Sequence, residues 1–275
     1  MNTLIESKDT AKPKRETLAV RKLKNGLHAI IIAQNKGGES KSMASLEVYL
    51  AALNSGFKTI LATMDQSNKT LVTALGDENK IVSVEIGSAS KLQRSLNEIF
   101  DSAEAEGAVL VLDTTPAYVD ENHPMIPAMK KTRIFEGENS IAALIPMRPT
   151  PDAIRGAVDA LRVMPVDFKR CLIRAWHHDP DAPGWSEFPA YAAMAEKYPV
   201  CNLGTWLQTT EDIIHKHGEF AEFPHLDALE TYYQQHAFEH SRLERNAMLN
   251  TLEHFEDARL HIFKNLLEPL LEPME

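Results

Sequence analysis

Hydrophobic residues recur along this chain in two alternating patterns. Short runs that are apolar at every position, such as HAIIIA at 28–33, are typical of strands buried on both faces of a parallel sheet. Longer stretches carry a hydrophobic stripe at helical spacing, as 42–55 does with Leu46, Leu50 and Leu53. The alternation predicts an α/β fold, a three-layer sandwich around a mostly parallel sheet.

The same pattern sets the order of the elements. Strands are predicted at 28–33, 58–64, 81–86, 108–112, 140–147, 170–176 and 199–203, the last with a weaker pattern. Helices are predicted at 42–55, 90–105 and 151–163. Strand patterns end after about residue 206, and 225–268 has the spacing of helices with a buried stripe. We expect these helices to pack on the sheet and to end in an appendage, without forming a second globular domain.

Charge divides the chain into three parts. Residues 1–26 lack hydrophobic periodicity and are predicted to be a flexible basic arm; seven bases and three acids in residues 1–27 give it a charge of +4. Residues 27–218 form the predicted core. Residues 219–275 hold twelve acids and four bases, and are predicted to be an acidic helical extension of the same domain.

Composition excludes several classes of protein. The chain of 275 residues is 44% hydrophobic and 25% charged, as in ordinary globular proteins, and its net charge of −10 argues against wrapping DNA over a broad surface. Two cysteines are too few for a disulfide framework. There is no secretory leader pattern and no apolar run of the roughly 18 residues that cross a membrane, so we expect a cytoplasmic protein.

The chemistry is concentrated between the first strand and the first helix. The loop QNKGGESKS at 34–42 carries two glycines and ends in Lys41 and Ser42, as a phosphate-binding P-loop does. In such a loop the backbone N–H groups and the helix N-terminus surround phosphate oxygens, the lysine neutralises the β- and γ-phosphates, and the hydroxyl ligates Mg²⁺. The standard pattern is not satisfied, because Asn35 and Ser40 stand where it requires glycine.

The loop resembles the deviant Walker A motif, K-G-G-x-G-K-[ST], of the ParA/MinD family of dimeric ATPases. The resemblance implies a P-loop NTPase fold of the SIMIBI type, with ATP or ADP and Mg²⁺ as cofactors. It implies cofactor contacts at Lys36, Gly37, Gly38, Glu39, Ser40, Lys41, Ser42 and Met43. Lys36 matches the lysine that reaches the partner subunit's phosphates. Ser40 replaces a glycine; if this position needs a positive φ, the serine costs roughly 1–2 kcal/mol.

Two later segments resemble further motifs of the family. KTILATMDQSNKTL at 58–71 is similar to a strand ending D-x-D-P-Q, with Asp65 at the position associated with the attacking water and Thr63 at the first aspartate. VLVLDTTP at 109–116 is similar to the Walker B strand, with Asp113 at the aspartate that holds Mg²⁺ through water. Taken alone, such strand-end carboxylates could simply cap the next turn, and the two lysines could be ordinary surface residues.

The implied function is a ParA-like ATPase in plasmid or chromosome partition, or in plasmid mobilisation. Lys36, Lys41 and Asp65 are the predicted catalytic residues, and Ser42 and Asp113 the predicted metal ligands. ATP would switch homodimerisation. The acidic C-terminal helices are a candidate contact for a partner protein, and the basic arm a candidate contact for nucleic acid.

Two alternatives remain open. A degenerate, non-hydrolysing nucleotide-binding scaffold is motivated by Ser40 and Thr63. A MinD-like ATPase that cycles on and off a membrane would need a basic amphipathic C-terminus. The segment 262–273 is amphipathic but acidic, so we expect no membrane contact.

Overall fold

The computed structural model describes residues 21–34, 40–65, 71–72, 75, 81–115, 139–177, 184–206 and 241–272. Its centre is a seven-stranded sheet in the order β3-β2-β4-β1-β5-β6-β7. Every strand pair in the described part of the chain is parallel. The strands are β1 His28–Ile32, β2 Thr59–Thr63, β3 Ile81–Ser83, β4 Val109–Asp113, β5 Ser140–Met147, β6 Lys169–His177 and β7 Val200–Trp206.

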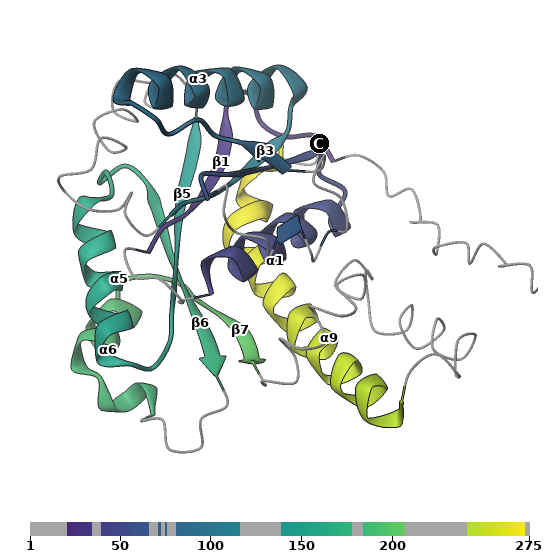
Figure 1. Cartoon of the computed structure of the whole chain (residues 1–275), viewed down its shortest axis with the longest axis vertical. Coiled ribbons are helices and arrows are strands. Elements are labelled where there is room, and N and C mark those ends of the chain that lie inside the picture. The colour runs from purple at the N-terminus through teal and green to yellow at the C-terminus, as the bar shows by residue number, and fades with distance from the viewer. Residues whose placement is uncertain are drawn as a thin grey trace, which may run out of the picture.

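Helices cover both faces of this sheet (Figure 1). They are α1 Lys41–Asn54, α3 Ala89–Glu106, α5 Pro151–Val163, α6 Pro189–Ala195 and α9 Arg242–Ile262. Alternate residues of β1 point to opposite layers: Ile30 and Ile32 join the core beneath α1 and α9, whereas Ala29 and Ile31 join the core beneath α3, α5 and α6. The three-layer α/β sandwich predicted from the hydrophobic pattern is confirmed.

Local signals explain where the helices on one face begin and end. Ser88 accepts a hydrogen bond from the Lys91 N–H at the start of α3, and Gly107 ends that helix at φ 58°. Thr150 caps α5 in the same way, accepting from the Ala153 N–H. α1 differs, because the side chain of Ser40 before it makes no capping bond.

The C-terminal helix is part of the body of the molecule. α9 runs past α1 and packs against β7, and it continues as a π-helical turn Phe263–Leu267 and a 3-10 turn Glu268–Leu270 (Figure 1). Ala258, Ile262 and Leu266 belong to the core beneath α1. Arg259 forms a bidentate ion pair with Glu47 of α1, with N–O distances of 2.9 and 3.2 Å.

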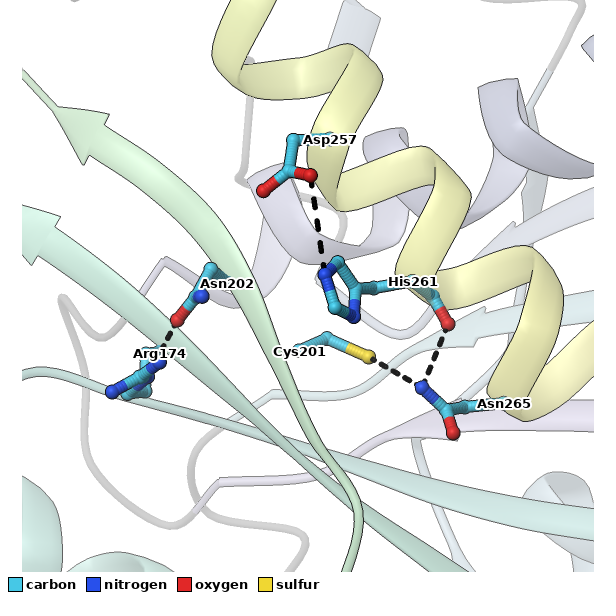
Figure 2. Close-up of polar contacts among 6 residues, drawn as sticks. All are labelled: Arg174, Cys201, Asn202, Asp257, His261 and Asn265. Carbon is cyan, nitrogen blue, oxygen red and sulfur yellow. Dashed lines mark hydrogen bonds and ion pairs between the residues drawn. The ribbon is translucent and has the colours of Figure 1, made fainter.

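Polar contacts also join this end of α9 to the sheet. Figure 2 shows the Asn265 amide donating to the backbone oxygen of His261 at 3.0 Å and to Cys201 Sγ of β7 at 3.8 Å. Cys201 in turn lies 3.6 Å from Cys171 Sγ of β6; both are free thiols in the core. On β6 and β7, Arg174 donates to the Asn202 side chain, also drawn in Figure 2.

Residues 21–26, assigned from sequence to the basic arm, are attached to the C-terminal end of the chain. Leu23 and Leu271 form an antiparallel bridge and pack against the core. Lys22 pairs with Glu272 at 2.8 Å, and the Lys24 N–H donates to the Leu270 carbonyl at 3.0 Å. Residues 1–20 and 207–240 lie outside the described residues, so the three-part division of the chain stays a prediction.

Element bounds differ little from those predicted. β5 and α5 have the predicted bounds, and β3 ends at Ser83, three residues earlier than expected. The short 3-10 turn Trp185–Glu187 and α6 had no sequence prediction, because seven residues are too few to establish a helical period.

Candidate nucleotide and metal site

The sequence-predicted site lies at the carboxyl edge of the sheet. Asp113 ends β4, and Thr63 ends β2 beside it, paired with Asp113 in the strand register. Lys41 and Ser42 begin α1, which follows β1 on the other side of β4. Parallel strands bring residues from distant parts of the chain to one edge, where α/β proteins bind ligands.

Asp113 is the centre of the arrangement. Its side chain is buried, with 1% of the residue exposed. Three hydroxyl groups surround the carboxylate: Ser42 Oγ lies 3.2 Å and Thr63 Oγ1 3.4 Å from Oδ2, and Ser45 Oγ lies 2.9 Å from Oδ1. The structure therefore brings together the two predicted metal ligands, Ser42 and Asp113.

Burial raises the pKa of Asp113 to about 6, from an ordinary value of 3.8. Desolvation is the largest cause, and the charge of Asp65 acts in the same direction. Hydrogen bonds from Ser45 and Ser42 and the charge of Lys41 lower the pKa, but do not offset the burial. A buried carboxylate with this pKa is stabilised by a cation that can approach it.

The donor set fits a magnesium ion of the P-loop kind. Mg²⁺ prefers oxygen ligands and is usually held by one or two protein groups together with substrate phosphates. Ser42 Oγ and the Asp113 carboxylate are such oxygens, within hydrogen-bond distance of each other. Among the residues that the structure describes, no three histidine, cysteine, aspartate or glutamate side chains gather as a metal cluster.

The start of α1 suits an anion. Its first turn contains no acidic residue, and the side chain of Ser40 makes no capping bond there. Lys41 is 8% exposed and lies close enough to lower the pKa of Asp113. The N–H groups at a helix N-terminus and a neighbouring lysine are a suitable site for phosphate oxygens. Met43 packs its side chain in the core, so only its backbone N–H is available for such a contact.

Ser40 has φ 58° and ψ 27°, in the left-handed region. It is the one residue other than glycine with positive φ within the described ranges. The position thus has the backbone conformation for which glycine is suited, and the serine costs roughly 1–2 kcal/mol there. Lys36, Gly37, Gly38 and Glu39, predicted to contact the cofactor, lie outside the described residues.

Asp65, the predicted water-orienting residue, follows β2 and is half-buried. Its backbone N–H donates to Thr63 Oγ1 at 3.1 Å. The carboxylate lies near enough to raise the pKa of Asp113. Asp65 is therefore next to the predicted metal ligands.

Sequence reasoning missed one residue of the site and the hydrogen-bond partners of one residue of the loop. Ser45 lies one turn after Ser42 on the same face of α1, and this spacing could have identified it. Gln34 is fully buried, and its amide donates to the carbonyl oxygens of Pro146 and Ala153, joining the end of β1 to β5 and α5. No sequence signal locates those acceptors, because both lie more than 100 residues away.

Comparison with solved structures identifies the fold. Nucleotide-free McdA of Cyanothece has a TM-score of 0.51 and 12% identity, with 86% of this chain and 99% of McdA covered. A McdA variant in complex with ATP has a TM-score of 0.52 and 12% identity, covering 92% and 100%. Aquifex aeolicus MinD, in its complex with MinC, has a TM-score of 0.48 and 15% identity, covering 90% and 98%.

This chain therefore has the fold of McdA, and this supports the resemblance indicated by the loop motif. No family model and no curated protein sequence matches the chain. Within the described ranges no helix is both long and apolar enough to span a membrane.

Proposed function

We propose that this chain, which shares its fold with McdA and its loop motif with the ParA/MinD family, is an ATP-binding protein of that family. Its proposed activity is Mg²⁺-dependent ATP hydrolysis coupled to homodimerisation. The proposed setting is plasmid or chromosome partition, or plasmid mobilisation. The observation that carries the proposal is the contact between Ser42 Oγ and Asp113 Oδ2, at 3.2 Å. A P-loop site requires a hydroxyl at the start of the helix and a carboxylate at the end of a strand, and this contact brings the two together.

Each residue of the site has a role in this proposal. Ser42 and Asp113 hold Mg²⁺, which supplies charge stabilisation for the phosphates. Lys41 neutralises the β- and γ-phosphates from the start of α1, and the N-terminus of that helix, whose first turn has no acidic residue, faces phosphate oxygens. Asp65 orients the attacking water. Because phosphoryl transfer depends mainly on positioning and charge, few protein groups are needed.

Dimerisation is proposed on the resemblance, and the partners on the charge of the two ends of the sequence. Lys36 would reach the phosphates bound by the second subunit, so the dimer would form with ATP. The basic arm is proposed to contact nucleic acid and the acidic C-terminal part a partner protein.

The test replaces Lys41 by alanine. We expect Lys41→Ala to abolish ATP binding, measured by calorimetry with Mg²⁺ present, and to remain monomeric with ATP in light scattering. Lys58→Ala is the matched control, since Lys58 is a half-exposed lysine outside the site that pairs with Glu106. Unchanged ATP affinity in Lys41→Ala would show that the site is assigned incorrectly.

The left-handed conformation of Ser40 favours a second candidate function, a nucleotide-binding scaffold that does not hydrolyse ATP. The backbone strain lies in Ser40, directly before Lys41 and Ser42. Its side chain stands where the glycine of the family's motif has only a hydrogen atom. Phosphate-release assays on the wild type, with DNA and partner protein added, separate the two candidates.

A further inference from the structure

Thr63 occupies a position in the site that the resemblance does not explain. The related motif has aspartate there, but this chain has a threonine that is 6% exposed at the end of β2. Its register partner on β4 is Asp113. A second carboxylate beside Asp113 would add like charge in a buried place, whereas a hydroxyl adds a hydrogen-bond donor.

The hydroxyl of Thr63 stands between two functional residues. It donates to Asp113 Oδ2 at 3.4 Å and accepts the Asp65 backbone N–H at 3.1 Å. A threonine hydroxyl has one proton to donate and lone pairs to accept, so both bonds form at once. A continuous chain of hydrogen bonds therefore runs from Asp65 through Thr63 to the carboxylate of Asp113.

Ser42 shares the same carboxylate oxygen. Its Oγ lies 3.2 Å from Asp113 Oδ2, so two hydroxyls donate to one carboxylate oxygen, which has lone pairs for both. A hydroxyl that ligates a cation through a lone pair keeps its proton to donate. A cation held at Ser42 and Asp113 would draw charge from the carboxylate, so Oδ2 would accept less strongly from Thr63 when the site is occupied.

Hydrogen bonds in series strengthen one another in a buried environment. A weaker bond from Thr63 to Asp113 makes the threonine oxygen a poorer acceptor for the Asp65 N–H. We propose that Thr63 is a positioning residue, whose hydroxyl couples occupancy of the Ser42–Asp113 site to the placement of Asp65. This inference rests on the proposed function and extends it to a residue specific to this chain.

The test follows the amide hydrogen of Asp65 by NMR exchange, with and without Mg²⁺ and a non-hydrolysable ATP analogue. We expect the loaded wild type to exchange this hydrogen about 1.5-fold faster than the free protein, because the bond exists in both states and only its cooperative part, about 10–30% of its strength, changes. Thr63→Ser keeps the hydroxyl and should respond in the same way. Thr63→Val keeps the shape without the hydroxyl and should not respond.

Turnover provides a second measurement. Thr63→Val should lower kcat about tenfold with KM nearly unchanged, because the lost bond positions Asp65 and does not hold nucleotide. Thr63→Ser should restore kcat. Thr59→Val is the matched control: Thr59 begins the same strand, donates only to the nearby Phe57 carbonyl, and should leave both readouts unchanged. If Thr63→Val does not fold, Thr63→Ala removes the hydroxyl without adding a methyl group.

Several results would overturn the coupling. The first is that the analogue changes the Asp65 exchange rate equally in Thr63→Val and in the wild type. The second is that the wild type binds the analogue but its Asp65 exchange rate does not change. The third is that Thr63→Ser and Thr63→Val lower kcat equally. Failure of the proposed function looks different, because calorimetry would then detect no binding of the analogue to the wild type. In that case the coupling falls together with the site.

Discussion

Ser40 is the residue at which backbone conformation and side chain conflict. Its φ of 58° is favourable for glycine and unfavourable for serine, because the β-carbon of an L-residue crowds the backbone there. The cost falls at the start of α1, directly before Lys41 and Ser42. The strain therefore belongs to the site and not to the scaffold.

At this scale we predict that Ser40→Gly stabilises the protein by about 0.5–1 kcal/mol. Relief of roughly 1–2 kcal/mol of strain exceeds the extra chain entropy that glycine adds to the unfolded state. Urea denaturation measures the change. Ser55→Gly, at the other end of α1 with φ −90°, should give no such gain. Raised phosphate release in Ser40→Gly would show that the natural loop is attenuated, and a loss of stability would contradict the strain argument.

At the scale of elements, α1 depends on α9. Most of α1 is buried, including Glu47, which is 0% exposed and contacts Arg259 of α9 through both carboxylate oxygens. Burial raises the pKa of Glu47, and the guanidinium of Arg259 opposes that rise. The pair thus connects the C-terminal helix to the helix that follows the loop motif.

We predict that Arg259→Met lowers the free energy of unfolding by about 3–5 kcal/mol, because a buried carboxylate is left without its partner. The double variant Glu47→Leu with Arg259→Met should recover most of this loss, since an apolar pair needs no compensation. Urea denaturation measures both.

The matched control is Arg94→Met on α3, where the ion pair with Glu98 is exposed and spans 4.0 Å. It should change stability by less than about 0.5 kcal/mol. If Arg259→Met were no more destabilising than this control, the buried pair would not be what holds α9 to α1.

For the whole molecule, the stability of the nucleotide-free protein depends on pH through Asp113. Its folded pKa of about 6 lies above the ordinary 3.8, so the folded state binds the proton more tightly than the unfolded state. The contribution of this proton to the stability of the folded state is fully present below pH 3.8 and is lost as pH rises through 6. From the two pKa values the loss reaches about 3 kcal/mol.

Asparagine at this position has no proton to lose. We therefore predict that nucleotide-free Asp113→Asn is more stable than the wild type by about 3 kcal/mol at pH 8, and by about half of that at pH 5. Denaturation at several pH values measures the difference. Asp167→Asn, in an exposed turn, should leave the pH dependence unchanged. A constant difference between pH 5 and 8 would contradict the raised pKa of Asp113.

Much of the scaffold could be predicted from local pattern. β5 and α5 have the predicted bounds because an apolar run and a capped, Pro-initiated helix are signals within a few residues of chain. Lys41, Ser42 and Asp113 could be placed at one edge, because they follow or begin elements of a parallel sheet. The left-handed Ser40 was anticipated from the glycine that it replaces.

Other features depend on contacts that no local pattern records. Arg259 and Glu47 are 212 positions apart, and either charge alone would be expected at the surface. The bridge between Leu23 and Leu271 joins the two ends of the described chain, although 1–26 lacks any periodic signal. Ser45 became a site residue only when β4 placed Asp113 opposite α1.

By itself the sequence determined the alternation of strands and helices, and it indicated the loop motif and its candidate residues, since these follow from side-chain periodicity and short motifs. Only the tertiary structure decided which groups share the Asp113 carboxylate, how α9 holds α1, and where Gln34 finds its acceptors. The physical reason is that hydrogen bonds and buried charge depend on distances of a few ångströms between segments far apart in the chain. Such distances arise when the sheet assembles.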